Sequence, residues 1–261
     1  MPKFSANLSM LFGERPFIDR FAAAAEAGFE GVEYLFPYDY EAQELAERLR
    51  EHGLSQVLHN LPAGDWEAGE RGIAVLPERV DEFRDGVRRA IDYARVLGCS
   101  QVNCLAGIAP EDADPDELRS TFVRNLRYAA ERLAEHDIIL LVEAINTRDI
   151  PGFYLNTTAQ AVSVVEEVGA SNLKLQYDVY HMQVMEGDLV PTIERNLDRI
   201  GHIQVADNPG RNEPGTGEIA YPFIFKRLDE LGYDGWVGCE YKPAGDTVAG
   251  LDWVRPYLSR R

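Results

Sequence analysis

Long apolar runs, paired cysteines and an excess of basic charge are all missing from this sequence. No stretch of 18 or more consecutive apolar residues occurs, so we expect no transmembrane helix. The first residues also lack the apolar region of a signal peptide, which favours a cytoplasmic protein. Only three cysteines occur, and their odd number and apolar surroundings favour reduced core thiols over disulfides. These are Cys99, Cys104 and Cys239.

The balance of charge argues against nucleic acid as a partner. The 261-residue chain carries 44 acidic and 26 basic residues, for a formal net charge of −18. Such a field repels polyanions, and no basic stripe is present to overcome it. A small anionic substrate stays compatible with this charge, because a bound cation and a few arginines can reverse the potential within a pocket. We therefore expect a small-molecule substrate and neither nucleic acid nor membrane as a partner, and a homo-oligomer is compatible with this interpretation.

Phosphate-binding glycine motifs are absent as well. No Gly-x-Gly-x-x-Gly or Gly-x-x-x-x-Gly-Lys-Ser/Thr segment follows any predicted strand, so neither a dinucleotide fold nor a P-loop has support. The densest glycine cluster, at 214–218, lies in the middle of a predicted loop. The sequence therefore contains no motif for a dinucleotide cofactor or for the phosphates of a nucleotide.

What the sequence does contain is an alternation of short apolar runs with longer amphipathic stretches, repeated eight times. Such an alternation predicts eight βα units, and hence a closed barrel or a large doubly wound sheet. The predicted strands are 3–8, 31–35, 55–60, 100–105, 138–144, 173–178, 201–206 and 235–241. The predicted helices are 16–27, 41–52, 77–97, 115–136, 157–168, 187–199, 221–231 and 245–258. No linker interrupts the series, so we expect one domain over 1–261.

The longest predicted connections all follow strands. Residues 61–76, 145–156 and 206–220 each join a strand to the next helix, whereas the helix-to-strand connections are mostly short. In parallel α/β folds the carboxyl ends of the strands carry the functional site, and long loops at that end contact the substrate. We therefore expect the site at the carboxyl ends of the strands.

Four of the predicted strands end in a polar residue that could bind a metal ion. The alternation of strand faces directs these four side chains inward at one end of the sheet: Glu143, Asp178, Gln204 and Glu240. Three carboxylates brought together without a cation would repel one another, so a shared divalent ion is the simplest account. Oxygen ligands favour a hard ion, Mg²⁺ or Mn²⁺. The rival ligand is His202, one layer deeper, which would instead favour zinc or cobalt.

Several residues beside this cluster are candidates for contacts with the substrate. His181 follows Asp178 by three residues and should lie on a loop beyond the strand, where it could polarise a substrate oxygen. Alternatively, His181 orients Asp178 or caps the next helix. His59 and Asn60 end the third predicted strand and are placed similarly. An anionic substrate would also require a nearby cation. The cationic candidates on the loops and strand ends of this face are Arg71, Arg148, Arg211 and Lys242.

Short segments around these residues carry a resemblance to a known family. The segments are 142–146, 176–183, 202–207, 217–219 and 239–241, which include an Asp-x-Tyr-His element and a Gly-Glu-Ile element. Together they resemble the hydroxypyruvate isomerase family of xylose-isomerase-like barrels, and the similarity covers essentially the whole chain. The resemblance implies a single (β/α)8 TIM barrel. It also implies that the metal ligands are Glu143, Asp178, Gln204 and Glu240, with Glu143 and Glu240 as the acid and base.

The charges of such a site indicate its chemistry. A divalent ion that holds the carbonyl and hydroxyl oxygens of an α-hydroxycarbonyl compound acidifies the C–H between them and stabilises the enediolate. One glutamate can remove that proton and the other can return it to the adjacent carbon. Such chemistry needs no organic cofactor. Together with the resemblance, it implies a metal-dependent isomerase of the aldose-ketose type, an intramolecular oxidoreductase, that interconverts hydroxypyruvate and tartronate semialdehyde.

Other functions are open at this point. The same site would serve a 2-oxo-tetronate isomerase. It would also serve a ketose 3-epimerase, although that branch usually has histidine where this chain has Gln204. A phosphodiesterase resembling endonuclease IV would need a histidine-rich site for three zinc ions, and this chain has only five histidines. A barrel that binds a metabolite without turnover is disfavoured by the intact pair Glu143 and Glu240.

Overall fold

Eight parallel strands close into a barrel in the computed structural model, which describes residues 2–258. The strands follow one another around the barrel in chain order, and the last pairs with the first. They are β1 (Lys3–Asn7), β2 (Gly31–Glu33), β3 (Ser55–Asn60), β4 (Gln101–Cys104), β5 (Ile139–Glu143), β6 (Leu173–Asp178), β7 (Ile200–Val205) and β8 (Trp236–Cys239). Of the two architectures that eight βα units allow, the chain therefore adopts the closed barrel.

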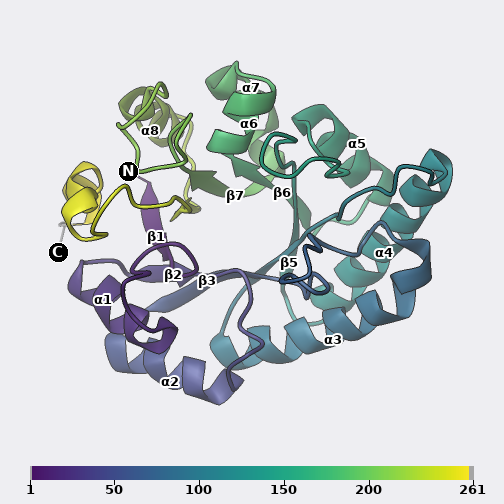
Figure 1. The fold of residues 1–261 in the computed structure, drawn as a ribbon, viewed down its shortest axis with the longest axis horizontal. Coiled ribbons are helices and arrows are strands. Elements are labelled where there is room, and N and C mark those ends of the chain that lie inside the picture. The colour runs from purple at the N-terminus through teal and green to yellow at the C-terminus, as the bar shows by residue number, and fades with distance from the viewer. Residues whose placement is uncertain (1, 259–261) are drawn as a thin grey trace.

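Helices surround the barrel in the order of the chain (Figure 1). They are α1 (Arg20–Glu26), α2 (Ala42–His52), α3 (Val80–Leu97), α4 (Pro115–Ala134), α5 (Thr158–Val168), α6 (Val179–Met185), α7 (Leu189–Asn196), α8 (Tyr221–Glu230) and α9 (Arg255–Leu258). Short 3-10 turns adjoin some of them: η1 (Phe17–Asp19), η2 (Pro77–Arg79), η3 (Leu197–Arg199) and η4 (Ala249–Trp253). Across residues 2–258, no helix combines the length and the apolar composition needed to cross a bilayer.

Local sequence signals account for several of these boundaries. Gly53 and Gly98 follow α2 and α3 with φ angles of 65° and 64°, a left-handed conformation that ends a helix and turns the chain into the next strand. Helix α5 begins at a capping box, in which the Thr157 side chain accepts from the backbone N–H of Gln160 and the Gln160 side chain accepts in return. The boundaries of α2, α3 and α5 thus lie close to the predicted ones.

The segment after β6 differs from its prediction. The sequence predicts a loop there, but the chain enters α6 directly, with Asp178 as the N-cap residue. Oδ1 of Asp178 accepts hydrogen bonds from the backbone N–H groups of Tyr180 and His181, at 2.8 Å and 3.3 Å. His181 therefore lies in the first turn of a helix. Near the C-terminus, the predicted helix 245–258 is divided into η4 and α9.

The interior of the barrel differs from the layer between the strands and the helices. Most buried apolar side chains belong to one large cluster, while a small second cluster stands apart from it. The second cluster contains Val57, Leu58, Leu141, Ile139 and Trp236. Leu141 shares the inward face of β5 with Glu143, because residues two apart on a strand point the same way. The barrel interior therefore changes from apolar to polar toward the carboxyl ends of the strands.

Candidate active site

A cavity of about 510 Å³ opens at the carboxyl ends of the strands. Its wall includes Glu143 at the end of β5, Glu240 just beyond β8, and His181 from α6. The long loops that follow the strands supply its rim, including Trp66, Arg71, Asp149, Arg211 and Lys242. The cavity therefore lies at the face where the loop lengths predict a site.

Glu143, Asp178 and His181 converge in this region, and one potential ligand atom from each lies within 4.8 Å of the others. Nε2 of His181 is 3.8 Å from Oε1 of Glu143 and 3.7 Å from Oδ2 of Asp178. All three side chains are buried. Within residues 2–258, Oδ2 of Asp178 has no hydrogen-bond partner. A buried carboxylate oxygen without a partner, beside a second carboxylate, fits a site for a cation.

Arg211 connects Glu240 to this group. Nη2 of Arg211 lies 3.0 Å from Oε2 of Glu240 and 4.0 Å from Oδ2 of Asp178. Nη1 of Arg211 is 3.8 Å from Oδ2 of Asp149. One guanidinium thus offsets part of the negative charge of three carboxylates.

The loop that carries Arg211 is held in place by Asp207. The Asp207 carboxylate accepts hydrogen bonds from the backbone N–H groups of Gly215, Gly217 and Ile219, at 2.8, 2.9 and 3.1 Å. A side chain at Gly217 would overlap with the backbone carbonyl of Asn208 and with the carboxylate of Asp207, so only glycine permits this close approach. The Gly-Glu-Ile element of the sequence is therefore part of the support for Arg211.

The register of β6 and β7 places Gln204 level with Asp178. His202 pairs one layer deeper, with Gln176, as the strand alternation predicts. Nε2 of Gln176 donates to Oε2 of Glu143 at 2.8 Å and to Oε1 of Gln204 at 2.6 Å. The amide oxygen of Gln204 is therefore on the side of the carboxylates.

Burial and mutual repulsion raise the pKa values of the three carboxyl groups. Burial is the largest cause of the high pKa of Glu143, and the charges of Glu240 and Asp178 raise it further. Burial raises the pKa of Glu240 to about 8, against the opposing effect of Arg211. Burial also raises the pKa of Asp178, again against Arg211. A divalent cation would relieve this repulsion, and its binding would release protons.

The imidazole of His181 is held in one tautomer. Oδ1 of Asn146 accepts from the backbone N–H of Asp149 at 2.7 Å, so its Nδ2 faces Nδ1 of His181 at 2.6 Å. Nδ1 is therefore the acceptor, and Nε2 carries the hydrogen. Burial lowers the pKa of His181 well below its ordinary value, and Arg211 lowers it further. A neutral ring with its N–H directed at the carboxylates is suited to donate to a substrate oxygen.

Comparison with known proteins identifies the family. The profile of the xylose isomerase-like TIM barrels matches residues 21–257. The hydroxypyruvate isomerase of Escherichia coli (strain K12) is 57% identical over 257 residues, which cover 98% of this chain and 100% of that protein. The chain belongs to the hydroxypyruvate isomerase and 2-oxo-tetronate isomerase family. The family predicted from the sequence and its enzyme class, an isomerase, are therefore confirmed.

Two further relatives of this isomerase extend the comparison. The 2-oxo-tetronate isomerase of Cupriavidus necator is 50% identical over 260 residues, which cover 100% of both chains. The crystal structure of a family 2 AP endonuclease from Brucella melitensis superposes with a TM-score of 0.97 at 49% identity, covering 98% of this chain and 99% of that chain. The predicted xylose-isomerase-like barrel is thus confirmed over almost the whole isomerase.

Four of the isomerase residues predicted to contact the substrate line the cavity. They are His181, Arg71, Arg211 and Lys242. The guanidinium of Arg71 lies 4.1 Å from the centre of the Trp66 ring and donates to the backbone carbonyls of Trp66 and Glu70. In the part of the chain that the structure describes, neither Arg71 nor Lys242 forms an ion pair with a carboxylate.

Two other residues predicted to contact the substrate, His59 and Arg148, lie outside the lining of this cavity. The His59 side chain is fully buried outside the cavity lining, and burial lowers its pKa to about 4. Its neighbour Asn60 lines the cavity instead, because successive strand residues face opposite sides. Arg148 is also outside the lining, and its Nη2 donates to the hydroxyl of Tyr180 at 3.0 Å and to Oδ1 of Asn208 at 2.9 Å.

A buried carboxylate below the site, Glu33 at the end of β2, is missing from the residues predicted by sequence. Oε2 of Glu33 accepts from Oγ of Ser5 at 2.8 Å and lies 2.9 Å from Nε2 of His202. Oε1 of Glu33 accepts from Nε2 of Gln204 at 2.8 Å. Burial would raise the pKa of Glu33, but His202, Gln204 and Ser5 together hold it below its ordinary value.

Two asparagines, also missed, connect the first strands to the glutamates of the cavity. Nδ2 of Asn7 donates to Oε1 of Glu240 at 3.2 Å and to Oε1 of Glu33 at 3.3 Å. Nδ2 of Asn103 donates to Oε2 of Glu143 at 3.2 Å. Polar residues that alternate with apolar ones in β1 and β4 were the available signal for both.

Proposed function

We propose that this isomerase interconverts hydroxypyruvate and tartronate semialdehyde. The observation that carries the proposal is the placement of two buried glutamates, Glu143 and Glu240, on the wall of one cavity, beside the unpartnered oxygen of Asp178. The relative from Escherichia coli, 57% identical over nearly the whole chain, supports the choice of substrate. We also propose that residues 1–261 act as one barrel domain.

We propose that a divalent ion, Mg²⁺ or Mn²⁺, is bound at this site. The proposed ligands are Glu143, Asp178, Gln204 and Glu240. All of them offer oxygen atoms, which suit a hard cation. When bound, such an ion would acidify the C–H between the two oxygens of an α-hydroxycarbonyl substrate. His181 is less suited as a ligand, since its Nε2 carries the hydrogen in the tautomer that Asn146 imposes.

The two glutamates are proposed to carry the proton. One removes a proton from the hydroxymethyl carbon of hydroxypyruvate, and the other adds a proton to the carbonyl carbon, while the hydroxyl hydrogen passes from one oxygen to the other. Asn103 and Gln176 both hold Oε2 of Glu143, at 3.2 Å and 2.8 Å, which leaves Oε1 for the reacting substrate. The N–H of His181 would donate to the substrate oxygen that gains negative charge.

The carboxylate of the substrate is proposed to lie near Arg71 and Lys242. Both residues line the cavity without a carboxylate partner among residues 2–258, whereas Arg211 is engaged by Glu240. Cations of this kind favour an acid over a neutral ketose, because a charge-assisted hydrogen bond is stronger than a neutral one.

A 2-oxo-tetronate is the second candidate substrate. The relative from Cupriavidus necator, which is a 2-oxo-tetronate isomerase, is 50% identical along the full length of both chains. A cavity of about 510 Å³ has room for a four-carbon acid as well as a three-carbon one. The same proton transfer between Glu143 and Glu240 would serve both acids.

Deuterium exchange from solvent into the substrate tests this proposal. Hydroxypyruvate, a 2-oxo-tetronate and D-fructose would be compared with and without added Mn²⁺, together with product analysis. We expect exchange and isomerised product with an acid, dependent on Mn²⁺, and a loss of about 10³-fold in Glu143→Gln. Glu67→Gln, an exposed residue of the rim loop, is the matched control and should retain activity. Turnover of the ketose alone, or full activity in Glu143→Gln, would contradict the proposal.

A further inference from the structure

A chain of buried hydrogen bonds runs from the carboxylates of the site to the layer below. Nε2 of Gln176 donates to Glu143 and to Oε1 of Gln204, at 2.8 Å and 2.6 Å. Nε2 of Gln204 then donates to Oε1 of Glu33 at 2.8 Å. Both ends of the Gln204 amide thus form hydrogen bonds: its nitrogen donates to Glu33, and its oxygen accepts from Gln176, which also donates to Glu143.

The surroundings of Glu33 make it an acceptor. Besides Gln204, its two oxygens face the hydroxyl of Ser5 at 2.8 Å, Nδ2 of Asn7 at 3.3 Å and Nε2 of His202 at 2.9 Å. A carboxylate surrounded by four potential donors has no hydrogen to offer in return. The side chain above it must therefore present a donor.

We infer that Glu33 is a positioning residue that fixes the amide of Gln204 with its oxygen toward the ion proposed to lie beside Glu143 and Asp178. The inference rests on that proposed ion site. Glu33 would also determine that position 204 is an amide, because a carboxylate there would meet the Glu33 carboxylate with no hydrogen between them. The absence of a side chain at Gly238 is necessary as well, since a Cβ at this position would overlap with the Glu33 carboxylate.

The contact between Glu33 and Gln204 predicts a change in cation affinity opposite to the one that the number of carboxylate ligands alone would predict. An additional carboxylate among the ligands ordinarily strengthens the binding of a divalent cation. Above Glu33, however, Gln204→Glu should weaken it, because two buried carboxylates in contact repel one another. Adding Glu33→Gln should reverse the loss. Its amide nitrogen can donate to the carboxylate introduced at position 204, while its oxygen still accepts from Ser5 and His202.

Calorimetric titration of the substrate-free protein with Mn²⁺ tests the inference. We expect Gln204→Glu to weaken Mn²⁺ binding by about 10-fold or more, and the double variant Glu33→Gln/Gln204→Glu to return to within about 3-fold of the wild type. The control is Ser5→Ala/Gln204→Glu, which removes another contact of Glu33 without supplying a donor at position 204, and it should show no recovery. If Gln204→Glu does not fold alone, recovery of the thermal midpoint in the double variant is the same result.

Two outcomes would overturn this inference and leave the proposed ion site intact. One is a Gln204→Glu variant that binds Mn²⁺ as tightly as the wild type or more tightly. The other is a loss of affinity or folding that Glu33→Gln does not restore. A wild-type protein that binds no Mn²⁺ would instead overturn the proposed ion site and this inference together, so the two failures are distinguishable.

Discussion

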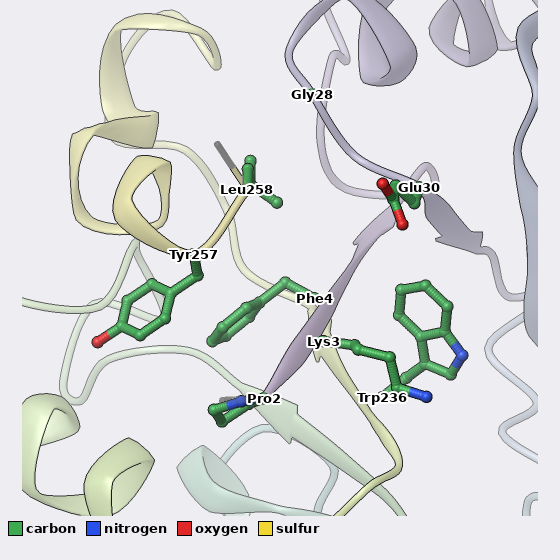
Figure 2. Close-up of a pocket in the computed structure, with 8 residues that line it drawn as sticks. All are labelled: Pro2, Lys3, Phe4, Gly28, Glu30, Trp236, Tyr257 and Leu258. Atoms are coloured by element: carbon green, nitrogen blue, oxygen red, sulfur yellow. The ribbon is translucent and has the colours of Figure 1, made fainter. Parts of the chain in front are cut away.

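The two openings of the barrel are lined by different kinds of side chain. At the carboxyl ends of the strands, the cavity of about 510 Å³ contains Glu143, Glu240 and Arg211. At the amino ends, a pocket of about 310 Å³ has the rings of Phe4 and Tyr257 on one side and the indole of Trp236 on the other (Figure 2). The cavity at the carboxyl ends thus brings together carboxylates that repel one another unless a cation lies between them. The pocket at the amino ends brings together aromatic rings that stabilise the fold.

Aromatic packing at the amino end joins the start of the chain to its last helices. The ring of Phe4 lies 5.1 Å from those of Phe225 and Tyr257, and 5.6 Å from that of Trp253. Aromatic pairs at these distances stabilise a fold beyond their apolar burial. The connections that lead from a helix into the next strand at this end are mostly short. Stability and chemistry are therefore separated along the barrel axis, as in other barrels of this type.

The largest difference that we predict between the two ends concerns how the free energy of unfolding of the ion-free protein depends on pH. Burial raises the pKa of Glu240 to about 8, above the value of about 4.3 for an unfolded chain. The folded state therefore keeps a proton that the unfolded state has lost. This contribution to stability is complete below about pH 4 and disappears as the pH rises through about 8.

We expect the variant Glu240→Gln, which cannot ionise, to gain stability relative to the wild type as the pH rises from 5 to 8. The gain should be a few kcal/mol, at most about 4 kcal/mol. Urea unfolding with a chelator present measures it. Phe4→Leu at the amino end is the comparison, since loss of apolar packing should destabilise the protein equally at both pH values. A constant difference between Glu240→Gln and the wild type would show that the Glu240 carboxyl is not strained by burial.

A smaller effect is expected within the carboxyl end itself, between two arginines. Arg71 lines the cavity, whereas Arg148 lies outside its lining and binds Tyr180. Arg71→Ala should raise KM for hydroxypyruvate about 10-fold, because a charge-assisted contact with the substrate carboxylate is lost. Arg148→Ala should change KM less than about 2-fold, since exposed charges contribute little. Steady-state kinetics of both variants measures these KM values. Equal changes in KM in the two variants would remove Arg71 from the proposed substrate site.

Local patterns in the sequence were enough to locate the eight βα units and the end of the barrel that carries the cavity. Strand alternation also gave the register of Gln204 over His202, because the period of two is fixed by the backbone. The sequence does not predict helix α6, because the position of Asp178 at a strand end indicates a metal ligand, whereas its carboxylate also caps a helix. The Asp178 carboxylate faces the site and also caps a helix, and the alternation of strand residues indicates only the first of these roles.

Residues that depend on contacts across the barrel were harder to predict. The sequence offers both His59 and Asn60 at the end of β3, and in the closed barrel only Asn60 of the two lines the cavity. Glu33 was overlooked, because its partner Gln204 lies 171 positions away in the sequence. Such a pair becomes visible only when the closed barrel brings β2 and β7 to face one another across its interior.

The smallest effect that we predict lies at the amino end. Nζ of Lys3 is 5.3 Å from the centre of the Trp236 ring, in a contact open to solvent at the edge of the pocket (Figure 2). Lys3→Ala should lower the free energy of unfolding by about 0.5–1 kcal/mol, as exposed cation–π contacts do. It should leave kcat/KM and Mn²⁺ affinity unchanged, because the apolar cluster that contains Trp236 lies between this pocket and the polar layer. A loss of Mn²⁺ affinity in Lys3→Ala would mean that a structural change at the amino end reaches the ion site through that cluster. The stability of one end and the chemistry of the other would then be coupled.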